Sequence, residues 1–125
     1  TPFFQTFEER LRDLGHVEGQ NTAFEYRNAE GDINRLPNLA AELVRLDASV
    51  IVTSTAAATN AVRQATATIP ILMVAINYDP IALDYVNNLA RPSGNLTGLF
   101  FQHLELLAKR FGLFKEMLPS VRRVA

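Results

Sequence analysis

Two short polar groups stand directly behind apolar runs in this sequence, at positions where a ligand could be held. The first run, at residues 49–53, is rich in β-branched side chains, and the second covers residues 71–76. Both runs have the composition of strands buried in a parallel sheet. The polar groups that follow them are, in order, Ser54, Thr55 and Ala56, and then Asn77, Tyr78 and Asp79.

The first group combines two hydroxyls with the start of an expected helix. Free backbone N–H groups at a helix start bind anions, so Ser54, Thr55 and Ala56 are candidates for contacting a carboxylate or a phosphate. Ser and Thr are also common N-caps, and this role alone explains the same residues. Both interpretations stay open at this point.

The second group offers acceptors and an aromatic wall. Asp79 can accept hydrogen bonds from an ammonium group or a sugar hydroxyl, and Asn77 can donate or accept. Tyr78 can cover an apolar or aromatic part of a ligand. The pair Asp79 and Pro80 is equally typical of a helix start, in which the acid caps and the proline opens the first turn.

Other kinds of chemistry find little support. The chain has no cysteine, which excludes disulfides and thiolate sites, and His16 and His103 have no companion ligands, so we expect no metal and no cofactor. Glycine-rich nucleotide motifs and a nucleophile elbow are missing, so we do not expect an enzyme. The net charge is −1, with 12 basic and 13 acidic residues scattered along the chain, so we expect no nucleic-acid partner.

Alternating apolar patterns predict an α/β fold, a doubly wound and mostly parallel sheet. In such sheets ligands bind at the carboxyl ends of the strands, which brings the two polar groups to one edge. We expect strands at residues 22–27, 49–53, 71–75 and 96–100, with a further strand starting at 121–125. We expect helices at residues 2–14, 33–44, 56–67, 80–90 and 103–118, the second of them capped by Asp32.

Several motifs in one order resemble the substrate-binding proteins of bacterial ABC transporters. The first three are L-G-H-V-E-G-Q-N, R-L-P-N-L-A-A-E-L-V and T-I-P-I. The last two are D-P-I and L-A-R-P-S-G-N-L-T-G. They cover residues 14–21, 35–44, 68–71, 79–81 and 89–98. Relatives often carry glycine where this chain has Tyr78, and a glycine-rich turn where it has Ser54, Thr55 and Ala56.

This resemblance implies a Rossmann-like or flavodoxin-like lobe of a type I periplasmic binding protein. Such a protein is exported to the periplasm, binds a small solute between two α/β lobes and delivers it to an ABC transporter permease. An amino-acid-like solute is favoured, with its carboxylate at residues 54–56 and its ammonium at Asp79. No signal segment is present in this chain. Two alternatives are the ligand-sensing effector domain of a transcriptional regulator and a small α/β enzyme.

The resemblance also implies a division of the chain. Residues 1–101 correspond to the N-terminal lobe without its first strand, and residues 102–125 to a crossover helix and the start of the second lobe. In the strand order 2-1-3-4-5 the missing strand would lie between the strands at residues 22–27 and 49–53. Unpaired strand edges and the apolar stripe of the last helix lead us to expect self-association or element swapping of this chain alone.

Overall fold

Three parallel strands form the centre of the computed structural model, which describes residues 2–76, 78–85, 94–101 and 103–122. The strands are β1 (Ile51–Thr53), β2 (Ile71–Ile76) and β3 (Leu96–Phe101), and they lie in the spatial order β1-β2-β3. Ile71 of β2 pairs with Ile51 on one side and with Leu96 on the other. The predicted α/β class is therefore confirmed, with β2 as the central strand.

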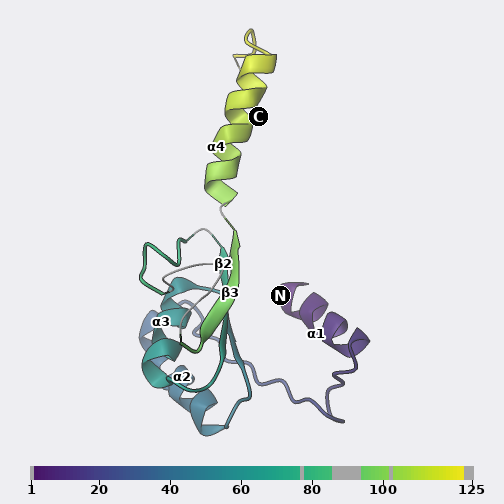
Figure 1. Cartoon of the computed structure of the whole chain (residues 1–125), viewed down its shortest axis with the longest axis vertical. Helices are drawn as coiled ribbons and strands as arrows, with labels where there is room; N and C mark the ends of the chain where they lie inside the picture. The colour runs from purple at the N-terminus through teal and green to yellow at the C-terminus, as the bar shows by residue number, and fades with distance from the viewer. Residues whose placement is uncertain (1, 77, 86–93, 102, 123–125) are drawn as a thin grey trace.

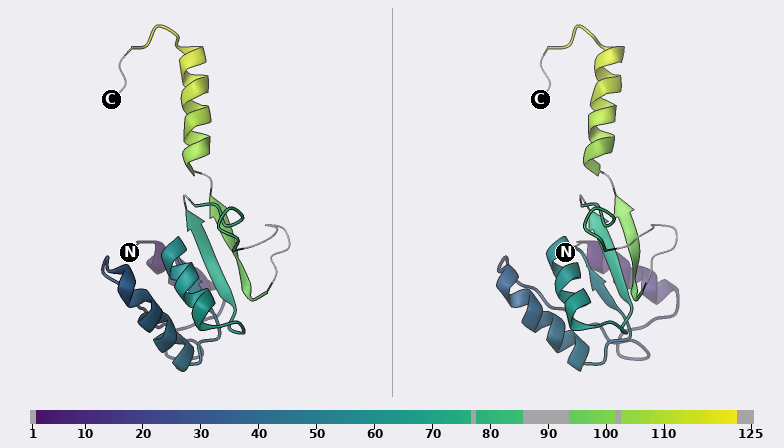
Figure 2. Two further views of the ribbon diagram at one scale, coloured as in Figure 1. Left: turned by 90° about the vertical axis from the view of Figure 1, so that its left-hand side faces the viewer. Right: turned by 60° about the vertical axis from the view of Figure 1, so that its left-hand side comes forward.

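Two helices cover one face of this sheet. They are α2 (Leu36–Arg45), preceded by the short 3-10 helix η1 (Ile33–Arg35), and α3 (Ala56–Ala65), and both lie on the same side in Figures 1 and 2. Asp32 caps η1 by accepting a hydrogen bond from the Asn34 N–H, as the sequence predicted for a helix start here. The core lies between these helices and the sheet; its buried members are Ala40, Ile51, Ala61, Val62, Ile71, Met73, Ala75 and Leu96.

The helix at the start of the chain, α1 (Pro2–Asp13), lies on the opposite side of the sheet from α2 and α3 (Figures 1 and 2). It ends before Gly15, whose φ of 91° is a left-handed conformation that glycine adopts without steric cost. This end agrees with the sequence prediction. Tyr26 contacts this helix through an edge-to-face packing on Phe4 and a hydrogen bond to Glu8.

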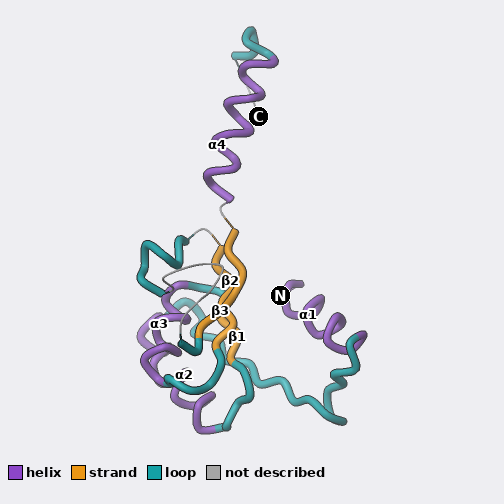
Figure 3. The backbone as a smooth tube through the Cα atoms, in the orientation of Figure 1, coloured by secondary structure: helices purple, strands orange, loops and turns teal. Residues whose placement is uncertain are grey.

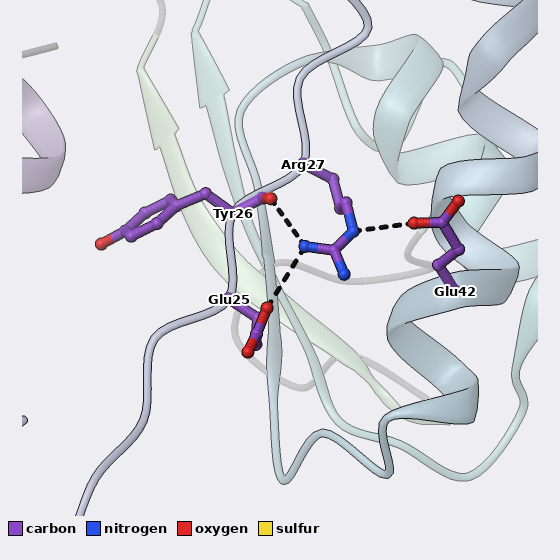
Figure 4. A network of polar contacts seen from close by, with 4 residues as sticks. All are labelled: Glu25, Tyr26, Arg27 and Glu42. Carbon is purple, nitrogen blue, oxygen red and sulfur yellow. Dashed lines mark hydrogen bonds and ion pairs between the residues drawn. The ribbon is translucent and has the colours of Figure 1, made fainter. Parts of the chain in front are cut away.

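The strand predicted at residues 22–27 does not form, and that prediction is wrong. Apart from an isolated bridge between Glu18 and Thr22, residues 23–29 have no regular structure (Figure 3). A strand needs a neighbour for its main-chain hydrogen bonds, and none of the described strands pairs with this segment. Arg27 instead connects the segment to α2, because its Nε lies 2.9 Å from Glu42 Oε2 (Figure 4). Its Nη1 lies 3.2 Å from Oε2 of Glu25 within the same segment.

The helix predicted at residues 80–90 is also wrong over its described part. Residues 80–84 form hydrogen-bonded turns, closed by a 2.8 Å bond from the Tyr85 N–H to the Pro80 carbonyl. Asp84 has a φ of 55°, which no α-helix accommodates. Residues 86–90 lie outside the described residues, as do 123–125, while 121–122 are not in a strand.

The last helix, α4 (His103–Met117), extends away from the sheet in every view (Figures 1 and 2). Its described side chains are exposed, including Leu106, Leu107, Phe111, Leu113, Phe114 and Met117. Over the residues that are described, none of the helices combines the length and the apolar content that crossing a bilayer requires.

Candidate functional site

The carboxyl end of β1 leads directly into α3 and carries the first predicted group. Thr55 has extended backbone angles (φ −135°, ψ 155°), and its Oγ1 accepts a 3.1 Å hydrogen bond from the Ala58 N–H. The N-cap interpretation of Thr55 is therefore confirmed. Because this hydroxyl accepts from the backbone, its own proton remains available for donation. Ser54 is exposed beside it, and Ala56 is half-buried in the first turn.

The carboxyl end of β2 carries the second group. Asp79 Oδ1 accepts hydrogen bonds from the N–H groups of Ile81 (2.8 Å) and Ala82 (3.3 Å), so this acid caps the turn that follows. Its second oxygen, Oδ2, makes no hydrogen bond to any other described residue. Pro80 is fully buried, whereas Asp79 is exposed. Asn77, the remaining member of this group, lies outside the described residues.

Direct hydrogen bonds join the two strand ends. The hydroxyl of Thr59 on α3 lies 2.8 Å from Thr53 Oγ1 and 3.3 Å from the phenolic oxygen of Tyr78. The phenol of Tyr85 donates a 2.9 Å hydrogen bond to the Ala56 carbonyl. Sheet topology alone predicted this proximity, and in the described part the structure brings Ser54, Thr55 and Ala56 to the same edge as Tyr78 and Asp79.

Two aromatic rings stand beside the first turns of α3. Tyr78 and Tyr85 meet edge to face, with ring centroids 6.3 Å apart and an interplanar angle of 76°. The guanidinium carbon of Arg63 lies 4.9 Å from the centroid of Tyr85, and its Nη2 donates to the Asp84 carbonyl at 3.3 Å. Burial raises the pKa of Tyr85, the neighbouring Tyr78 adds to that rise, and Arg63 opposes it.

Sequence analysis did not single out Thr59, Arg63 or Tyr85. One signal for the first two was present: Ala56, Thr59 and Arg63 are spaced by three and four residues, which places them on one face of a helix. That face is the one turned to the loop after β2. Tyr85 had no such signal, because the turn that brings it back to α3 was predicted as a helix.

Two other features of the described residues bear on the choice of site. Among the described residues no cluster of three His, Asp or Glu side chains could hold a metal ion. A shallow hollow lies at the other end of the sheet, where β2 and β3 begin, and is lined by Ala67, Thr68, Pro70, Gly94, Asn95, Leu96 and Thr97. It is far along the strands from the predicted group, and its lining carries no charge, so we place the candidate site at the carboxyl ends.

Several known proteins are similar to this chain in sequence and fold. A tyrosine-binding protein of Clostridioides difficile (strain R20291) is 28% identical over 118 residues, which cover 94% of this chain and 33% of that protein. A conserved domain protein from Vibrio cholerae O1 biovar eltor shares 32% identity with a TM-score of 0.79, over 94% of this chain and 38% of its own. The chain thus spans about a third of the length of these relatives.

A third relative has been solved with a ligand. This ABC domain from Streptococcus pneumonia, in complex with L-Trp, has a TM-score of 0.67 and 28% identity, over 74% of this chain and 30% of its own. Residues 3–125 match the profile of the family described as ABC transporter substrate binding protein. This match extends over nearly the whole chain, and the fold agrees with it. The chain therefore belongs to the family of ABC transporter substrate binding proteins.

Proposed function

We propose that this chain forms one wall of the cleft in which an ABC importer's binding protein holds an amino-acid-like solute. The observation that supports this is the pairing of a donor end and an acceptor end at one edge of the sheet. Thr55 and the start of α3 offer hydrogen-bond donors, and the exposed Asp79 offers a negative charge. An α-amino acid carries a carboxylate and an ammonium group, which need a donor and an acceptor of this kind.

The proposal extends to the whole protein. Residues 1–101 would form the first lobe, and residues 102–125 the crossover helix and the start of a second lobe that closes over the solute. Delivery would be to an ABC transporter permease, from the periplasmic side of the membrane. The relatives that bind tyrosine and tryptophan support an aromatic amino acid as the first solute to test. No catalytic step is part of this function.

The test is a thermal shift assay on the full-length protein with a panel of amino acids, using sugars and nucleosides as controls. A solute at a hundred times its dissociation constant stabilises the folded state by about 2.7 kcal/mol, which such an assay detects. A shift with tyrosine or tryptophan supports the proposal. A shift with sugars or nucleosides alone would reject the amino-acid assignment.

Asp79→Asn isolates the charge of the acid from its capping role. Asn caps a helix or turn about as well as Asp, so this variant keeps the bonds to Ile81 and Ala82 and loses only the charge. Loss of a hydrogen bond to a charged group lowers affinity by about 10- to 100-fold. Asp32→Asn is the matched control, because Asp32 caps η1 in the same way and lies outside the candidate site. Equal affinities in both variants would exclude Asp79 from ligand binding.

A further inference from the structure

The hydroxyl of Thr59 lies at the centre of three polar contacts and is completely buried. Its Oγ1 is 2.9 Å from the Thr55 carbonyl oxygen, 2.8 Å from Thr53 Oγ1 and 3.3 Å from the phenolic oxygen of Tyr78. Thr53 is buried as well, and Tyr78 is half-buried against the core. Bulk water therefore does not compete for the Thr59 hydroxyl, and the positions of the three hydroxyl protons follow from these contacts.

Only one distribution of protons satisfies all three contacts. A carbonyl oxygen cannot donate, so Thr59 must give its single proton to Thr55. Because the Thr59 proton is donated to the Thr55 carbonyl, the Thr59 oxygen can only accept hydrogen bonds from the other two hydroxyls. Thr53 and Tyr78 therefore both donate to Thr59. A hydroxyl oxygen has two lone pairs, so accepting two hydrogen bonds fills its capacity.

This assignment fixes what Tyr78 can offer a ligand. With its proton directed at Thr59, the phenolic oxygen presents lone pairs only and acts as an acceptor. The edge-to-face contact with Tyr85 restrains the ring in this orientation. Thr55 has the opposite polarity, because its oxygen accepts from the Ala58 N–H and its proton is free to be donated. The two ends of the candidate site are thus polarised in opposite senses.

We propose that Tyr78 is a specificity-determining residue that selects ligands with an N–H donor, and that Thr59 is the positioning residue that sets this preference by holding the phenol proton. The inference rests on the proposed function and deepens it, because it names a second acceptor beside Asp79. A ligand with an ammonium group is accepted. A ligand that presents only hydrogen-bond acceptors to the Tyr78 phenolic oxygen faces its lone pairs and is disfavoured.

The experiment compares two ligands by isothermal titration calorimetry on the full-length protein. L-Tyrosine carries the ammonium group, and 3-(4-hydroxyphenyl)propanoic acid is the same molecule without it. The quantity measured is the ratio of the two dissociation constants. We expect Tyr78→Phe to reduce the preference for L-tyrosine by about tenfold or more, because a hydrogen bond to a charged group is lost for one ligand and not for the other.

Variants of Thr59 test the positioning role. Thr59→Val keeps the shape and removes the acceptor, so the Tyr78 proton is released and the phenol can donate outward. The ratio should fall toward that of Tyr78→Phe. Thr59→Ser keeps the hydroxyl and should retain the wild-type ratio, which separates proton direction from a general loss of packing. If a variant destabilises the fold, its affinity for both ligands falls by the same factor, so this effect cancels in the ratio of dissociation constants.

Two outcomes would overturn the inference and are distinguishable. If L-tyrosine binds and the ratio is unchanged in Tyr78→Phe and in Thr59→Val, the inference is wrong while the cleft and its solute class stand. If the wild-type protein binds no amino acid in the thermal shift panel, the proposed solute class fails and this inference fails with it.

Discussion

Replacing Gly98 with alanine should destabilise the sheet strongly. A Cβ added at Gly98 would lie 2.0 Å from the main-chain oxygen of Met73, its partner in the register of β2 and β3, and 2.6 Å from Met73 Cγ. Ordinary contact begins at 3.4 Å, so the strands would have to separate by 1.4 Å, the difference between the two values. Met73 is 2% exposed and has no room to move aside.

The magnitude follows from two costs. Forcing an extra methyl group into a packed region typically costs about 1–3 kcal/mol. A separation of this size also stretches the neighbouring ladder hydrogen bonds past their normal length, at about 0.5–1.5 kcal/mol each. We expect the free energy of unfolding to fall by about 3 kcal/mol, measured by urea denaturation of the full-length protein. In this chain the requirement falls on the last residue of the L-A-R-P-S-G-N-L-T-G segment.

Gly112→Ala is the matched control for this prediction. Gly112 lies within α4, and an added Cβ there meets nothing within 4 Å. Alanine is the better helix former, so this variant should be neutral or stabilised by about 0.5–1 kcal/mol. Surface substitutions usually change the free energy of unfolding by no more than about 0.5 kcal/mol. If Gly98→Ala changed the free energy of unfolding by no more than this, the pairing of Gly98 with Met73 would be refuted.

Three further predictions concern other parts of the chain. Asn95→Ala removes the 2.7 Å hydrogen bond from Nδ2 to the Ile69 carbonyl and should lower the free energy of unfolding by about 1–2 kcal/mol; an unchanged urea midpoint would contradict this. Burial and then Glu8 raise the pKa of Tyr26 to about 12, so its protonated form is favoured in the fold, and the resulting stability is lost as the pH rises from 10 through 12. Glu8→Gln should lower that pKa partway toward 10 in an ultraviolet titration, and an unmoved transition would reject the contact. The 125-residue chain alone should self-associate through α4, and Phe111→Lys should weaken this; light scattering from a monomer at all concentrations would exclude it.

Much of the fold was predictable because the apolar runs are local signals. The strands at Ile51, Ile71 and Leu96 are short apolar runs bounded by turn residues, and the parallel pairing of the first two follows from the helix α3 between them. The segment at residues 22–27 alternates like a strand, yet forming one depends on a neighbouring strand that the described chain does not supply. Local pattern cannot report whether that partner is present.

The position of the candidate site in the sheet was predictable from the sequence, but only some of the residues that form it were. Strand ends and helix starts are visible in the sequence, so Thr55 and Asp79 could be named, together with their capping alternatives. The contacts of Tyr85 with Ala56 and Arg63 depend on the turn at residues 80–84, whose left-handed Asp84 overrides the helical spacing of its apolar side chains. A tertiary contact of this kind produces no periodic pattern of apolar residues in the sequence.

The loop at residues 23–29, tied to α2 through the Arg27 side chain, has a consequence for hydrogen exchange. Its backbone lies in no helix or strand, so its amides should exchange with deuterium almost as fast as those of an open chain. The amides of residues 71–73 in β2 lie between two strands and are released only when the sheet itself opens. A single deuterium time course therefore contains both limits, with this loop as the internal fast reference and β2 as the measure of global stability.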